Sequence, residues 1–124
     1  MYQSIEKFSM GTGDRFGLEG QAQLEALVQA HRQGISVAPV WNKSFREHEI
    51  TGTQPVSVRQ EADAAVKALS WQSSYYVDAD HISLVNVDSF IESADFFTLD
   101  VADFIGKDCD EKEQEKFVED NKKH

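Results

Sequence analysis

The sequence predicts an α/β fold in which parallel strands alternate with helices. Short apolar runs alternate with longer stretches whose apolar residues recur at helical spacing. The runs start at intervals of about 30 residues, which is the length of one βα unit. They are also continuously apolar, as expected of strands that are buried on both faces. These three observations favour a parallel sheet with crossover helices.

The first βα unit begins with a strand expected at residues 5–10, followed by a glycine-rich turn at residues 11–17. A helix is expected over residues 18–33, because its large apolar residues fall on one face. Those residues are Leu24, Leu27 and Val28. Gly34 then supplies the left-handed residue that commonly ends a helix.

The second unit starts with a β-branched strand at residues 35–41. A long polar loop is expected over residues 42–55, and an alanine-rich helix over residues 57–69. Ser57 and Gln60 have the spacing of a capping box, which satisfies free N–H groups at a helix start. We therefore expect that helix to begin after Ser57.

Two further strands are expected at residues 75–77 and 96–99, with a short helix at residues 88–93 between them. Four βα units are about half of a TIM-type (β/α)8 barrel, which needs roughly 250 residues. We therefore expect residues 1–106 to form the amino-terminal half of such a barrel, as a fragment of a longer domain. Residues 107–124 carry seven acids and five lysines, which predicts a charged, solvated tail.

The charge of the chain argues against two classes of partner. Its 12 basic and 22 acidic side chains give a net charge of -10, which repels phosphate backbones and anionic lipid. We therefore expect no nucleic-acid binding and no membrane binding. The single cysteine, Cys109, forms no internal disulfide, and neither a signal peptide nor a membrane-spanning run is evident. These features predict a cytoplasmic protein.

Polar and ionisable residues follow each predicted strand. In parallel α/β sheets, sites gather where the strands end at their carboxyl side. The residues at these positions are Asp14 and Arg15, then Asn42, Lys43, Ser44, Arg46, Glu47 and His48, then Asp78, Asp80 and His81, and finally Asp100 and Asp103. We expect the functional site among them.

The sharpest of these groups is Asp78, Asp80 and His81. The period of a strand places the two aspartates on one face, where their charges repel unless something compensates. A divalent metal bound by His81 would compensate, and a nearby carboxylate could then act as a base. The alternative is a helix-capping or arginine-paired aspartate beside an exposed histidine.

The glycine-rich turn differs from a dinucleotide-binding loop, because Phe16 stands where that fingerprint has its third glycine. Asp14 and Arg15 after Gly13 fit a tight turn that presents N–H groups and a guanidinium to an anionic substrate. The alternative, which the sequence supports equally, is an ordinary turn that binds no ligand.

The segment after the second strand concentrates positive charge. Lys43 and Arg46 lie close together in a stretch of 106 residues that holds 7 basic against 15 acidic side chains. They suit capture of a carboxylate or phosphate, while Trp41 suits packing on a sugar face. The alternative is a solvated loop in which Arg46 pairs with Glu47 or Glu49.

These motifs closely resemble the amino-terminal part of the tagaturonate epimerase family, which interconverts tagaturonate and fructuronate in hexuronate catabolism. The resemblance runs from about Phe8 to Gly106 through FSMGTGDRFG, PVWNKSFREH, YYVDADHI and DFFTLDVADFIG. It implies a βα-barrel, a sugar-acid substrate and a divalent metal, with manganese, zinc, cobalt and nickel as candidates. Two routes to inversion stay open, a metal-assisted retro-aldol cleavage and a transient oxidation by nicotinamide.

Position by position, the resemblance implies that Asp80 accepts a proton, that His81 binds the metal and that Asp78 supports both. It also implies that the uronate carboxylate and hydroxyls are bound by residues of the first two loops. Those residues are Asp14, Arg15, Asn42, Lys43, Arg46 and His48.

Members of this family are several times longer than this chain, so the other metal ligands and the opposing acid should lie beyond His124. The resemblance therefore implies an incomplete enzyme that is inactive by itself and that associates with itself or with a complementary carboxyl-terminal half. The alternatives are a noncatalytic half-barrel that binds an acidic sugar or a partner half, and an α/β module with no ligand site.

Overall fold

The computed structural model describes residues 4–123 and contains a four-stranded sheet. Its strands are β1 (Ser9–Thr12), β2 (Ala38–Asn42), β3 (Tyr76–Ile82) and β4 (Phe96–Leu99). All neighbouring pairs are parallel, and the strands follow one another across the sheet in chain order. The predicted α/β class with parallel strands is therefore confirmed.

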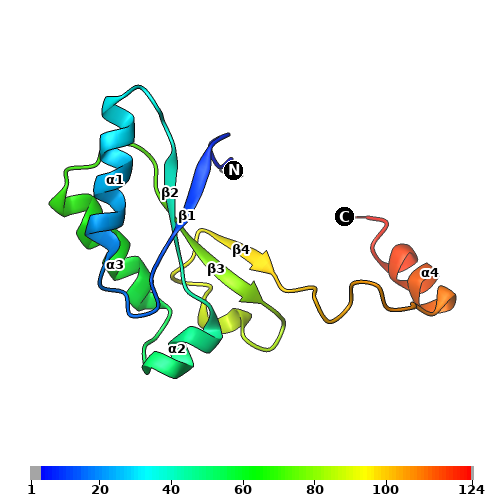
Figure 1. The fold of residues 1–124 in the computed structure, drawn as a ribbon. Helices are drawn as coiled ribbons and strands as arrows, with labels where there is room; N and C mark the ends of the chain where they lie inside the picture. The colour runs from blue at the N-terminus through cyan, green and yellow to red at the C-terminus, as the bar shows by residue number, and fades with distance from the viewer. Residues whose placement is uncertain (1–3, 124) are drawn as a thin grey trace.

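Two long helices, α1 (Gly20–Arg32) and α3 (Val56–Ala68), lie side by side against one face of the sheet (Figure 1). A short helix, α2 (Phe45–Thr51), follows β2, and a 3-10 turn, η1 (Val87–Ser89), lies between β3 and β4. The last helix, α4 (Glu111–Asp120), lies away from the sheet at the end of an extended segment (Figure 1). Residues 107–123 are exposed throughout, as the charge pattern predicts.

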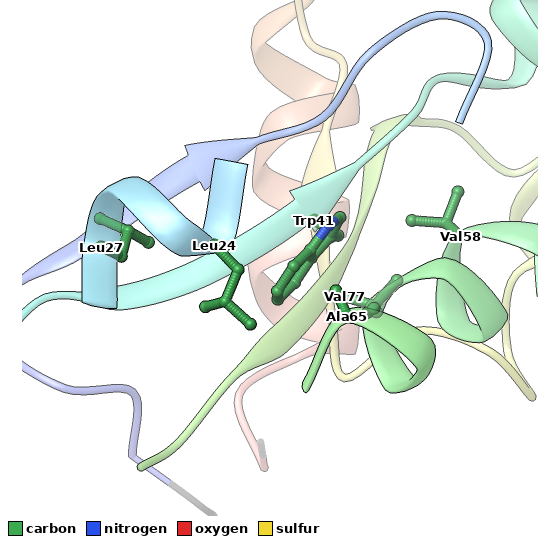
Figure 2. Packing of buried hydrophobic residues seen from close by; sticks show 7 residues of the cluster. Leu24, Leu27, Trp41, Val58, Ala65 and Val77 are labelled. Carbon is green, nitrogen blue, oxygen red and sulfur yellow. The ribbon is translucent and has the colours of Figure 1, made fainter. Parts of the chain in front are cut away.

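The main core lies between the sheet and the two long helices (Figure 2). Trp41 of β2 is completely buried at its centre. Around it pack Leu24, Leu27, Val58, Ala62, Ala65 and Val77. The predicted apolar stripe at Leu24 and Leu27 is thus the buried face of α1. The expectation that Trp41 packs on a sugar is wrong, because this indole fills the space between β2 and the helices.

The bounds of three strands differ from the sequence prediction, and the second of them forms at Ala38–Asn42 instead of residues 35–41. The first strand forms at Ser9–Thr12 instead of residues 5–10, because its backbone pairs with β2 from Ser9 opposite Ala38 to Thr12 opposite Trp41. The third strand continues to Ile82, so that both Asp78 and Asp80 belong to it.

The predicted loop at residues 42–55 is wrong in its middle, where α2 forms. Ser44 accepts a hydrogen bond from the Glu47 N–H at 3.3 Å, and the Glu47 carboxylate accepts one from the Ser44 N–H at 3.0 Å. This is a complete capping box. The box expected at Ser57 and Gln60 does not form, because α3 already begins at Val56.

Within residues 4–123, none of the helices combines the length and apolar content that a bilayer crossing requires.

Candidate active site

A cleft with a volume of about 760 Å³ lies at the carboxyl ends of the strands. Segments that follow all four strands contribute to its wall. The residues expected at the site that line it are Arg15, Asn42, Arg46, Asp80 and His81. Glu47, Asn86 and Asp100 line it as well. Parallel strands bring their carboxyl ends to one edge, which is why residues so distant in sequence meet here.

His81 occupies an unusual backbone position in this cleft. Its φ is 55°, a left-handed value that histidine seldom adopts, and the pairing of β3 with β4 shifts register between Ala79 and Ile82. A bulge of this kind re-aims a side chain at the end of a strand. The imidazole, 64% exposed, therefore projects among the polar groups of the cleft.

Two carboxylates flank the His81 imidazole. Its Nδ1 lies 3.3 Å from Oδ2 of Asp100, and its Nε2 lies 3.6 Å from Oδ2 of Asp80. The Ala102 N–H and then the His81 hydrogen bond hold the pKa of Asp100 below its ordinary value. The cleft thus combines an imidazole with two acids, of which Asp80 is the less exposed.

Asp78 lies deeper than Asp80 and does not line the cleft. Its two carboxylate oxygens share the Thr98 hydroxyl of β4, at 2.9 and 2.8 Å. Burial raises the pKa of Asp78, and the charge of Asp80 raises it further, while the Thr98 hydrogen bond opposes both. The position of Asp78 therefore fits support of the strand end rather than contact with a substrate.

The positive side of the cleft consists of Arg15 and Arg46. The Arg15 guanidinium lies 3.7 Å from the Glu47 carboxylate, across the mouth between the first two loops. Arg46 is exposed and forms no ion pair with residues 4–123, so its expected alternative pairing with Glu47 or Glu49 is not found. Arg46 is thus free to bind an anion.

The side-chain contacts of Asp14 stabilise the turn after β1. Its carboxylate accepts hydrogen bonds from four successive backbone N–H groups, those of residues 16–19. Partial burial acts to raise the pKa of Asp14, but these N–H groups together lower it below its ordinary value. Gly13 is required in the same turn, because a Cβ there would lie 2.4 Å from the Asn42 carbonyl oxygen. The turn holds Arg15 in place, while Asp14 itself faces the backbone.

Lys43 and His48 are buried beneath the cleft and do not line it. The Lys43 ammonium donates to Thr53 Oγ1 at 3.0 Å, and His48 Nδ1 lies 2.9 Å from the same oxygen. His48 also packs against Phe90, with ring centroids 5.9 Å apart. This placement connects α2 to its neighbours and keeps these two side chains off the cleft wall.

The buried site of His48 predicts a pH-dependent stability. Burial, and then the charge of Lys43, lowers the pKa of His48 to about 4, against about 6.5 in an unfolded chain. Between pH 6.5 and 4, His48 is protonated in the unfolded chain but stays neutral in the folded chain. His48 therefore lowers the free energy of unfolding as the pH falls toward 4. The full effect is about 3 kcal/mol. Urea unfolding from pH 7.5 to 4.5 should show this slope in the wild type and lose it in His48→Asn.

His31 provides the matched control, because it is exposed on α1. His31→Asn should keep the wild-type slope. An equal loss of slope in both variants, or none in His48→Asn, would contradict the buried neutral state of His48.

Six residues of the cleft wall have no site role predicted from the sequence: Ser44, Phe45, Glu47, Ile50, Asn86 and Asp100. Glu47 belongs to the pattern Ser44-Phe45-Arg46-Glu47, which has capping-box spacing and was a readable signal for α2. Ser44, Glu47 and Asp100 are among the polar residues that follow predicted strands. Asn86 donates to the His81 carbonyl at 3.2 Å, a contact that depends on the loop shape and has no sequence signature.

Comparisons with known proteins give a family match and a match in fold. The family model for tagaturonate epimerase matches residues 2–124. No curated protein gave a significant match. Solved structures of the fructuronate-tagaturonate epimerase UxaE from Cohnella laeviribosi are similar in fold. The complex with two glycerols has 25% sequence identity and a TM-score of 0.69, covering 95% of this chain and 25% of that one. The native structure has 24% identity and a TM-score of 0.70, covering 91% and 23%.

The chain thus spans about a quarter of the length of these similar structures. Its match to the family model nevertheless extends over almost every residue, from 2 to 124. The chain therefore belongs to the tagaturonate epimerase family.

Proposed function

We propose that this chain forms one wall of the active site of an enzyme that interconverts tagaturonate and fructuronate. The observation that carries the proposal is the cleft itself, where the ends of the four parallel strands and the segments after them bring together two arginines, three acids and a histidine. Membership of the epimerase family supplies the reaction. These side chains suit a sugar acid, because the arginines can pair with its carboxylate and the acidic side chains can accept hydrogen bonds from its hydroxyls.

We also propose that the sheet is part of a (β/α)8 barrel. The strands follow chain order, and α1 and α3 cover the same face, as in a singly wound sheet. A doubly wound sheet would reverse its strand order and carry helices on both faces. The two edge strands, β1 and β4, are largely exposed. Barrel closure would pair both edges, so the rest of the barrel is expected to come from additional chain or from a partner half.

In this proposal Asp80 takes a proton from the hydroxyl on the carbon that inverts. Both open routes, retro-aldol cleavage and transient oxidation, begin with loss of that proton, so the role is common to them. Asp80 is on the cleft wall with its side chain 26% exposed, and is therefore accessible to a substrate. Arg15 and Arg46 would hold the uronate carboxylate, and Asn42 would contact a hydroxyl.

The donors present fit part of a divalent metal site. His81 Nε2 and the Asp80 carboxylate are neighbours that suit manganese, zinc, cobalt or nickel. Within residues 4–123, however, no three acidic, histidine or cysteine side chains are grouped as a metal site. About three protein ligands are usual at a catalytic metal, so the remaining ligand would come from the rest of the barrel. When bound, the metal would stabilise negative charge on the oxygens of the sugar.

Ligand mapping by NMR tests the proposed cleft directly. Tagaturonate added to the 15N-labelled chain should shift the amide signals of Arg15, Asn42, Arg46 and Asp80. Tagatose, which lacks the carboxylate, should shift them much less, and Arg46→Gln should weaken tagaturonate binding. Shifts confined to the opposite end of the sheet, or equal shifts with both sugars, would contradict the proposal.

A second candidate is a noncatalytic half-barrel that binds an acidic sugar or a partner half. The observation in its favour is that the described part of the chain holds no group of three acidic, histidine or cysteine side chains arranged as a metal site. It predicts the same NMR shifts, but no turnover after the chain is joined to the rest of a family member. Turnover by the joined protein would reject it.

A further inference from the structure

We infer that Asp100 is a positioning residue for His81, whose carboxylate accepts the Nδ1 proton and leaves Nε2 as a lone-pair acceptor beside Asp80. Neither family membership nor the strand pattern assigns this role. Its relevance to turnover rests on the function proposed above, whereas the tautomer itself does not.

The two carboxylates beside the imidazole compete for its single proton in the neutral state. The Asp100 oxygen is 3.3 Å from Nδ1, within hydrogen-bonding range, whereas the Asp80 oxygen is 3.6 Å from Nε2, outside it. The shorter contact therefore determines the tautomer. The proton belongs on Nδ1, toward Asp100.

Asp100 is itself held by the backbone. Its N–H donates to the Ile82 carbonyl at 2.9 Å, and its Oδ1 accepts from the Ala102 N–H at 3.1 Å. The second oxygen, Oδ2, is thereby turned toward His81. One carboxylate thus links the segment after β4 to the imidazole at the end of β3.

The other side of His81 is fixed as well. The Asn86 side chain donates to the His81 carbonyl at 3.2 Å, and the His81 N–H donates to Oδ1 of Asp80 at 3.1 Å. The left-handed φ of 55° is therefore maintained by contacts on both sides of the residue. Backbone and ring are arranged before any ligand arrives, which is the state expected of a ligand-binding imidazole.

The tautomer decides whether Nε2 of His81 is a hydrogen-bond donor or a lone-pair acceptor. With its proton on Nδ1, a neutral histidine offers an Nε2 lone pair that can bind a metal or accept a proton from a sugar hydroxyl. With its proton on Nε2, the same nitrogen would be a donor and could do neither. Asp100 would therefore select the useful form.

Imidazole 15N chemical shifts measure this tautomer without substrate or metal. The experiment uses the 124-residue chain at about pH 9, where an ordinary imidazole is neutral, with His81→Gln to assign the His81 signals. The wild type should show mainly the Nδ1–H form. Asp100→Ala should move the majority to Nε2–H, because Asp80 is then the nearer carboxylate.

Two further variants keep the result interpretable. Asp100→Ser retains an oxygen for the Ala102 N–H but is too short to reach His81, so it should also shift the tautomer toward Nε2–H. Asp103→Ala removes an exposed acid from the same segment and should leave the tautomer unchanged. A wild-type Nε2–H form, or an Nδ1–H form retained in folded Asp100→Ser, would overturn the inference.

The outcome is separable from that of the proposed function. An Nδ1–H form in a joined protein that does not turn over tagaturonate would reject the epimerase and keep the role of Asp100. Normal turnover by a joined protein whose His81 is in the Nε2–H form would keep the epimerase and reject the role of Asp100.

Discussion

Asp80→Asn is expected to lower kcat for tagaturonate epimerisation by about 10²–10⁴-fold, the usual contribution of a general base. The variant would be made in this chain joined to the rest of a family member. Asparagine keeps the shape of the side chain but cannot take a proton at neutral pH. Because Arg15 and Arg46 would still hold the carboxylate, KM should change far less than kcat. Initial rates over a range of tagaturonate concentrations measure both constants.

Asp88→Asn is the matched control. Asp88 is exposed in η1 and is absent from the cleft wall, so this variant removes the same charge at a nearby position. It should keep kcat close to that of the wild type. A fall in kcat of less than tenfold in Asp80→Asn, or equal falls in both variants, would contradict the role of Asp80 as the general base.

Trp41→Ala is expected to destabilise the fold by about 3–5 kcal/mol, the range for loss of a large buried aromatic side chain. Trp41 is 0% exposed and separates β2 from α1 and α3 (Figure 2). It also meets the Tyr75 ring edge-on, with centroids 6.2 Å apart. Since a small domain is stable by only about 5–15 kcal/mol, much of the stability would be lost. Urea unfolding followed by far-ultraviolet circular dichroism measures the change.

Trp41→Phe separates packing from polarity. The Trp41 Nε1 is buried without a hydrogen-bond partner among residues 4–123, and phenylalanine removes this group while leaving a smaller cavity than alanine. Its loss of stability should therefore be clearly smaller. Equal losses in the two variants, or a change below about 1 kcal/mol in Trp41→Ala, would show that this core is not the one that holds the sheet.

Much of the fold was predictable because it depends on local patterns. The spacing of Leu24 and Leu27 predicted the buried face of α1, and the apolar runs predicted four parallel strands. The prediction failed at α2, where polar residues suggested a loop although Ser44 and Glu47 had the spacing of a capping box. It also misplaced the first strand, because pairing with β2 rather than local apolarity decides where β1 lies.

The site was predictable only as a region. The carboxyl ends of the strands did identify Arg15, Arg46, Asp80 and His81, which the structure brings to one cleft. Strand position alone could not separate these from Lys43 and the other polar residues that point elsewhere. Side-chain direction at a strand end depends on turns and bulges, such as the bulge between Ala79 and Ile82, and these form only when neighbouring strands pair.

The central claim is that this cleft is one wall of an epimerase site that the rest of the barrel completes. The most direct test is a tagaturonate epimerase assay with added manganese, run on this 124-residue chain and on the same chain joined to the remaining part of a family member. We expect fructuronate to form with the joined protein and not with the short chain. Turnover by the short chain alone would contradict an incomplete site, and a folded joined protein that produces no fructuronate would contradict the assigned reaction.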